Sequence, residues 1–197
     1  MKRVELFLLV LILGSLWGFF EMMALPVSVL CAIGLFFLVL GRRVIDIPGT
    51  SIVIGLIVCF YKTYSDYFFI CQWAGVMALA GSFELYASLV FKSSRQNILN
   101  NAVTGVLTNI TAFPVFVMLV TFILREPNWV DGGMERIINY GVHSVLPATL
   151  MSGLITAPLG FITGSKLNNL NVHLHGRLVP GIYLMLTAFL WIVASIN

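Results

Sequence analysis

The sequence predicts an all-α integral membrane protein, with a single transmembrane domain over residues 1–197 that is built as a bundle of six to seven helices. Composition is the first observation behind this prediction. Of the 197 residues, 59% are hydrophobic and only 10% are charged, whereas soluble domains carry about a quarter charged residues. A water-soluble fold of this length would leave roughly 30% of its chain surface exposed and could not hide so many apolar side chains. The composition excludes an ordinary soluble enzyme, a nucleic-acid-binding domain and a disordered chain.

The spacing of the apolar runs is the second observation. A bilayer core needs about 20 apolar helical residues. Candidate spans of this kind, joined by short linkers, lie at 4–25, 27–41, 47–63, 68–91, 98–124, 138–164 and 178–196. The third is the weakest, because its clean apolar part from Ile52 to Tyr61 is short, and it is expected to be a thin helix or a re-entrant segment. Pro114 and Pro158 lie inside spans and predict kinks there.

Positive charges predict the orientation. The first apolar run is too long for a signal peptide and has no small-residue cleavage site, so it is expected to be a retained span. Lysines and arginines favour the cytoplasmic side, and alternate linkers place Lys2, Arg3, Arg42, Arg43, Lys92, Arg95, Lys166 and Arg177 on one side and Lys62, Arg125 and Arg136 on the other. This predicts a multi-pass protein of the cell (inner) membrane with a cytoplasmic N-terminus.

Ionisable groups within apolar spans are the candidate site, because their burial in a bilayer costs several kcal/mol unless they are used or paired. The span order is expected to bring several of them to one level just beneath the outer surface. Asn109 lies with several threonines beside the Pro114 kink; the favoured interpretation is that such groups satisfy backbone carbonyls freed by the proline, and they could also hydrogen-bond a solute. The expected substrate-binding residues are Glu21, Lys62, Asp66, Trp73, Asn109 and His143. The alternative is an interfacial aromatic belt with snorkelling charges.

Glu84 is expected to be a buried carboxylate closer to the cytoplasmic side. It could couple conformations, carry protons or brace the bundle, and bracing is the favoured interpretation. Gly18-Phe-Phe-Glu21 and Gly81-Ser-Phe-Glu84 share a pattern, which an internal duplication or chance would both explain.

Metal and enzyme signatures are missing from the sequence. Cys31, Cys59 and Cys71 lie in apolar runs and are expected to be small buried hydrophobic residues. His173 and His175 have a chelating spacing but no third ligand nearby, so neither a metal nor another cofactor is expected. There is no HExxH motif, Walker A motif or dinucleotide fingerprint, so the chain is not expected to be an enzyme or to hydrolyse ATP itself.

Small residues at Gly14-x-x-x-Gly18 form a stripe where another helix can approach closely. With the chain length, the single hydrophobic domain and the glycine-rich Pro48–Val58 segment, this stripe resembles the substrate-binding S components of energy-coupling factor (ECF) transporters. The resemblance implies a vitamin- or metal-binding subunit whose transport is powered by a transmembrane coupling subunit and ATPases. It also implies that Gly14 and Gly18 face the coupling subunit. S components usually have six spans, whereas the charges here favour seven.

The leading hypothesis is therefore a membrane transport subunit that binds a small solute in an outward-facing pocket, with lipid and partner subunits around it and no nucleic acid. The alternative is a small integral membrane enzyme, or a metal- or haem-binding protein, that uses Glu21, Glu84 and His143. A third hypothesis, a structural assembly factor without a ligand, depends on the glycine stripe alone.

Overall fold

A computed structural model describes residues 3–23, 25–64, 69–90, 97–169, 181, 185 and 187–193, and in these ranges the regular structure is helical throughout. The α-helices are α1 Arg3–Met22, α2 Val27–Val44, α3 Thr50–Lys62, α4 Ile70–Val90, α5 Ile98–Met118, α6 Pro127–Tyr140, α7 Leu146–Met151 and α8 Ala157–Asn169. Three π-helical turns extend or join them: η1 Leu119–Ile123, η2 Gly141–Val145 and η3 Ser152–Thr156. Residues 187–193 are also helical. The all-α prediction is confirmed for the described chain.

Membrane-spanning capacity is confirmed more coarsely than the sequence predicted. In the described ranges, four helical stretches are long and apolar enough to cross a bilayer: Val4–Met22, Val27–Val44, Ile98–Ile123 and Pro127–Asn168. The count of six to seven spans is not confirmed. The third predicted span is the short helix α3, of 13 residues, and α4 carries the polar Gln72 and Glu84. Most of the seventh predicted span, with His173, His175 and Arg177 before it, lies outside the described residues.

Local sequence signals explain where several helices begin. Pro26 directly precedes α2, and Pro127 is the first residue of α6, positions at which proline's missing N–H costs nothing. Asn97 caps α5, because its side-chain oxygen accepts a hydrogen bond from the Asn100 N–H at 2.7 Å. Gly49 precedes α3 with φ +88°, a left-handed conformation that glycine adopts without strain. The linker predicted between the spans 98–124 and 138–164 is largely helical, because Trp129 and Arg136 both lie on α6.

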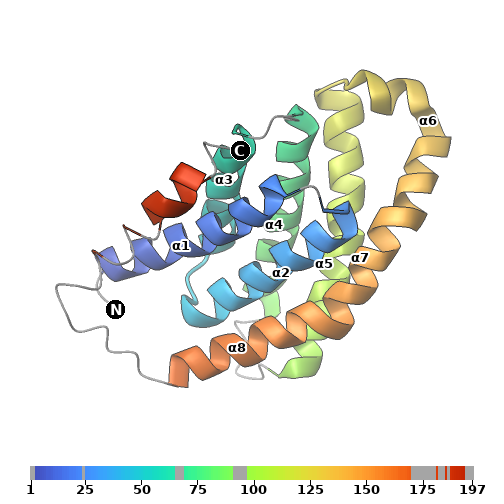
Figure 1. The fold of residues 1–197 in the computed structure, drawn as a ribbon. Helices are drawn as coiled ribbons and strands as arrows, with labels where there is room; N and C mark the ends of the chain where they lie inside the picture. The colour runs from blue at the N-terminus through green and yellow to red at the C-terminus, as the bar shows by residue number, and fades with distance from the viewer. Residues whose placement is uncertain are drawn as a thin grey trace.

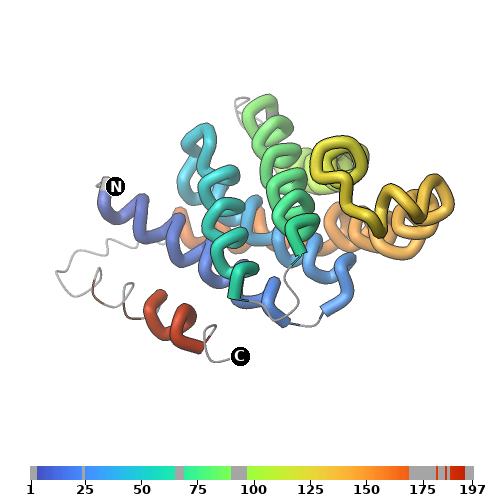
Figure 2. Tube along the Cα trace, turned by 90° about the horizontal axis from the view of Figure 1, so that it is seen from above, coloured from blue at the N-terminus to red at the C-terminus, as the bar shows by residue number. Residues whose placement is uncertain are grey.

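Helix α3 is the packing centre of the N-terminal half. It contacts α1 on one side and α4 on the other. Gly14 faces Ile57 and Gly18 faces Tyr61, so α1 and α3 run parallel. Gly55 faces Ala80 while Ser51, one turn earlier, contacts Glu84, so α4 runs antiparallel to α3. Figure 1 shows α6, α7 and α8 following one another in one long arc at the edge of the bundle, and Figure 2 shows the same arrangement from above.

The glycine stripe of α1 is filled by the chain itself. A Cβ atom added at Gly14 would lie 2.8 Å from Ile57, and one added at Gly18 would lie 2.6 Å from Tyr61. Both distances are far shorter than van der Waals contact, so the two glycines are needed for the close approach of α3. The expected assignment of Gly14 and Gly18 to a partner subunit's face is therefore corrected: the helix in the groove is α3.

The two expected proline kinks differ in their surroundings. Helix α5 continues through Pro114 as far as Met118, and its π-helical turn follows at Leu119. In the long arc, η3 directly precedes Ala157-Pro158, and η2 directly precedes Leu146-Pro147. A proline N cannot donate to the preceding turn, and π-turns are a common place for a helix to bend. The arc thus changes its hydrogen-bonding pattern just before each of these prolines.

Candidate functional site

A cavity of about 530 Å³ opens at the end of the bundle where α1 and α3 finish. Its walls come from α1, α2, α3, α4, α5, α6, η2 and α7, so segments from most of the chain converge on it. Most of the lining is apolar or aromatic. The polar members are Glu21, Lys62, Gln72, Asn109, Arg136 and Ser144. The volume falls within the roughly 300–1,000 Å³ of typical small-molecule sites, which likewise combine apolar walls with a few polar groups.

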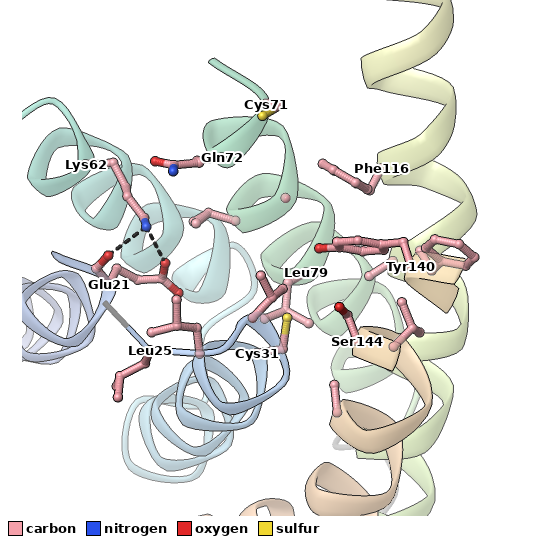
Figure 3. Close-up of a pocket in the computed structure, with 18 of the residues that line it drawn as sticks. Glu21, Leu25, Cys31, Lys62, Cys71, Gln72, Leu79, Phe116, Tyr140 and Ser144 are labelled. Atoms are coloured by element: carbon pink, nitrogen blue, oxygen red, sulfur yellow. Dashed lines mark hydrogen bonds and ion pairs between the residues drawn. The ribbon is translucent and has the colours of Figure 1, made fainter. Parts of the chain in front are cut away.

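A buried ion pair forms one wall of the cavity. The ammonium nitrogen of Lys62 lies 3.0 Å from Oε2 of Glu21 and donates a second hydrogen bond, of 2.6 Å, to the Glu21 backbone carbonyl. The indole N–H of Trp17 donates to the other carboxylate oxygen at 3.1 Å. Glu21 is 8% exposed and Lys62 is 5% exposed. Three polar groups thus satisfy one another inside the bundle, as buried charges require. Figure 3 shows the two contacts that Lys62 makes with Glu21.

An aromatic cluster forms the opposite wall. The ring of Phe116 lies 4.9 Å from that of Trp129 and 5.8 Å from that of Tyr140, and Trp129 lies 5.1 Å from Tyr140. Figure 3 shows the Tyr140 hydroxyl and the Ser144 side chain directed into the cavity, with Cys31 and Leu79 beneath. Such a wall offers flat apolar surface for stacking.

Helical periodicity explains which residues line the cavity. Cys71, Gly75 and Leu79 recur at intervals of four on α4, and Arg136, Tyr140, Ser144 and Ala148 do so along the arc. Residues four apart drift by roughly 40° per step around a regular α-helix. The wider π-turn η2 offsets part of this drift, which keeps the second series on one face.

The structure brings together three of the residues predicted from sequence and places three elsewhere or outside its range. Glu21, Lys62 and Asn109 line the cavity. Trp73 follows Gln72 on α4 but is not part of the lining, and His143 lies on the exposed face of η2 while its neighbour Ser144 lines the cavity. Asp66 lies outside the described residues.

Glu84 lies at the opposite end of α3 and braces the bundle. Its two carboxylate oxygens accept hydrogen bonds from the backbone N–H groups of Gly49 at 2.8 Å and Ser51 at 3.2 Å. The Arg42 guanidinium adds a contact of 3.8 Å. A carboxylate on α4 thus occupies the N-terminus of α3, where free N–H groups and the helix dipole favour negative charge.

A shared metal or haem site for Glu21, Glu84 and His143 is contradicted by this placement. Glu21 and Glu84 contact α3 at Lys62 and Ser51, which lie roughly 16 Å apart along that helix. In the part of the chain that the structure describes, no group of three His, Cys, Asp or Glu side chains could hold a metal ion. The threonines of the arc and of α5 are used within their own helices: Thr104, Thr108, Thr111 and Thr149 each donate to the carbonyl one turn earlier.

Several lining residues were missed by the sequence analysis. Cys31 and Cys71 were interpreted as buried hydrophobic residues, and Tyr140 and Ser144 were not singled out. Arg136 was counted only as a loop charge. The spacing of four between Arg136, Tyr140 and Ser144 is the signal that could have placed them on one helical face.

Comparison with known proteins does not identify a relative. No protein-family model, no curated protein and no solved structure matches the chain.

Proposed function

We propose that the protein is a membrane transport subunit that binds one small solute in the cavity beside the Glu21–Lys62 pair. The observation that carries the proposal is the cavity itself: about 530 Å³ of space, bordered by a buried ion pair on one side and by packed aromatic rings on the other. A bundle whose only task was structural would gain stability by filling such a space with side chains.

The positive charges at the end of the bundle opposite the cavity support an outward-facing site. Arg42 and Arg43 lie at the end of α2, and Lys166 lies in the last turn of α8, at the end of the bundle marked by Glu84. Lysines and arginines concentrate on the cytoplasmic side. We therefore propose that the Glu84 end lies on the cytoplasmic side of the inner membrane and that the cavity faces the exterior.

An energised complex is the second part of the proposal. The chain has no nucleotide-binding motif, so a coupling subunit and ATPases of the ECF kind would supply the energy. Because α3 fills the Gly14–Gly18 groove, such partners would dock on another face.

The testing experiment is native mass spectrometry of the protein extracted gently from its own membrane. The proposal expects a small molecule bound in a one-to-one ratio, and co-purifying ATPase subunits. The molecule released is then offered to cells with and without the protein, and uptake should depend on the protein. Two results together would contradict solute transport: no small molecule is bound to the purified protein, and cells with and without the protein take up the solutes of the membrane extract equally.

A further inference from the structure

We propose that the cavity takes a solute with a planar aromatic or heteroaromatic body and a carboxylate, and that Arg136 binds that carboxylate. This inference deepens the proposed function and rests on it, because it names the ligand class of the same cavity. It is argued from the charges on the cavity wall, the contacts of Arg136 and the position of the aromatic cluster.

The charges on the cavity wall favour an anion. Three charged residues line the cavity: Glu21, Lys62 and Arg136. Glu21 and Lys62 neutralise each other at 3.0 Å, and the Lys62 ammonium is further engaged by the Glu21 carbonyl. Among the residues that the structure describes, Arg136 forms no ion pair. Among the charged lining residues, Arg136 is therefore the one whose charge is not balanced by another lining residue, and a solute that contacts its guanidinium is favoured when it carries a negative charge there.

Arg136 is an exposed side chain at the cavity that packs against Trp129 and Gly132. Its guanidinium carbon lies 5.3 Å from the centre of the Trp129 ring, within the range of a cation–π contact. Its aliphatic stem crosses Gly132, where an added Cβ would lie only 2.7 Å from the Arg136 Cδ. A guanidinium held over a ring by its carbon still has N–H donors that match the two oxygens of a carboxylate.

The aromatic cluster beside Arg136 fits the rest of such a solute. Trp129 contacts both Arg136 and the rings of Phe116 and Tyr140, so a carboxylate at Arg136 places its attached ring against this wall. Offset or edge contacts between aromatic rings contribute about 0.5–1.5 kcal/mol beyond area burial. The neutralised Glu21–Lys62 pair lies on the far side of the cavity, next to the other end of such a solute.

The test compares three probes that share one ring system and differ in charge: 2-naphthoate, 2-naphthamide and 2-(aminomethyl)naphthalene. Equilibrium dialysis against the whole protein in lipid nanodiscs measures their affinities, with the naphthyl fluorescence reporting free probe. We expect 2-naphthoate to bind at least about tenfold more tightly than the other two. In R136Q this preference should fall below about threefold.

Arg125→Gln is the matched control. It removes the same charge at the same end of the bundle, from a residue that does not line the cavity. R125Q should keep the full preference for 2-naphthoate. Thermal unfolding of both variants shows that each is folded, and binding of 2-naphthamide by R136Q shows that its cavity is intact.

The outcomes separate this inference from the proposed function. Equal binding of the three probes overturns the carboxylate class while leaving solute binding in place, and an equal loss of preference in R125Q and R136Q overturns the role of Arg136. If no probe binds, the solute identified by native mass spectrometry decides: a ring-bearing carboxylate supports the inference, any other solute overturns it, and the lack of any solute overturns the proposed function as well.

Discussion

The Lys62 ammonium lies 3.0 Å from the Glu21 carboxylate and 2.6 Å from the Glu21 carbonyl oxygen. One side chain thus neutralises a buried charge and also satisfies a carbonyl near the C-terminus of α1. At the other end of α3, Glu84 accepts the N–H groups of Gly49 and Ser51. The short helix α3 is therefore fixed at both ends by carboxylates from the two helices that flank it. These carboxylates, Glu21 and Glu84, are the last residues of the two Gly-x-x-Glu segments of α1 and α4.

Removing one partner of the Glu21–Lys62 pair should be more harmful than removing both. Lys62→Met leaves a buried carboxylate without its cation, and we expect a loss of about 3–5 kcal/mol in the free energy of unfolding. The double variant Glu21→Gln/Lys62→Met keeps an acceptor for Trp17 and removes both charges, so it should recover most of that loss. Thermal unfolding in nanodiscs measures both. Equal unfolding temperatures for the single and double variants would contradict a buried pair.

Glu84→Ala should loosen the start of α3. The variant loses two hydrogen bonds to a charged acceptor, each contributing about 1.5–3 kcal/mol. Hydrogen exchange should quicken at Gly49 and Ser51. Asp46→Ala is the control at the same end, because Asp46 is 64% exposed and its 3.9 Å pair with Arg42 should contribute less than about 1 kcal/mol. Similar exchange rates in the two variants would argue against the bracing role.

Gly18→Ala tests whether the glycine stripe serves the chain itself. Its methyl group would lie 2.6 Å from Tyr61, and overpacking of this kind costs about 1–3 kcal/mol. Gly81→Ala is the matched control in α4, where an added Cβ meets nothing within 4 Å, and alanine should raise helix stability by up to about 1 kcal/mol. Unfolding of the isolated chain is the measurement. An unchanged stability in Gly18→Ala would reopen the assignment of this stripe to a partner subunit.

Two neighbours in η2 should respond differently to the same substitution. Ser144 lines the cavity, whereas His143 lies on the exposed face. Ser144→Leu places bulk in the cavity and should lower occupancy by the co-purifying solute by at least about tenfold. His143→Leu should leave occupancy unchanged, because its side chain is exposed and does not line the cavity. Native mass spectrometry of the two variants compares them, and a loss confined to His143→Leu would show that the helix has the opposite face inward.

Cysteine labelling checks the orientation of the long arc. In a variant with Cys31, Cys59 and Cys71 replaced by Ala, Asn128→Cys at the cavity end should react with an impermeant maleimide in intact cells. Lys166→Cys at the other end should react only after the membrane is opened. Reaction of both in intact cells would contradict a crossing between these positions, and the reverse pattern would place the cavity inside.

The sequence predicted the positions of the helices well, but it predicted less well which face of each helix is buried. Apolar length and charged linkers mark where a helix starts and stops, so α2 and α5 lie close to the predicted 27–41 and 98–124. A helix in lipid is apolar on all sides, however, so hydropathy carries little information on which face turns inward. Glu21 and His143 were predicted at the same depth, yet the first is buried in the bundle and the second is exposed.

Contacts that depend on several helices were beyond the sequence. The Gly14–Gly18 stripe correctly indicated close helix packing, but only the packed bundle shows that α3 is the helix it receives. The cavity likewise depends on how the Phe116, Trp129 and Tyr140 rings stack, which no local pattern specifies. Charge burial was the more informative signal, since Glu21, Lys62 and Glu84 are all buried and paired.

The most direct measurement of the central claim is solute occupancy in two leucine variants of α4. Gly75 lines the cavity, and an added Cβ there is 3.8 Å from Phe116, so Gly75→Leu fills space that the solute needs. Gly81→Leu adds the same bulk about 1.7 helical turns away, at a residue that does not line the cavity. Solute binding in this cavity predicts that native mass spectrometry finds the small molecule on the wild type and on Gly81→Leu and finds it missing from Gly75→Leu. Equal occupancy of the two variants would contradict it.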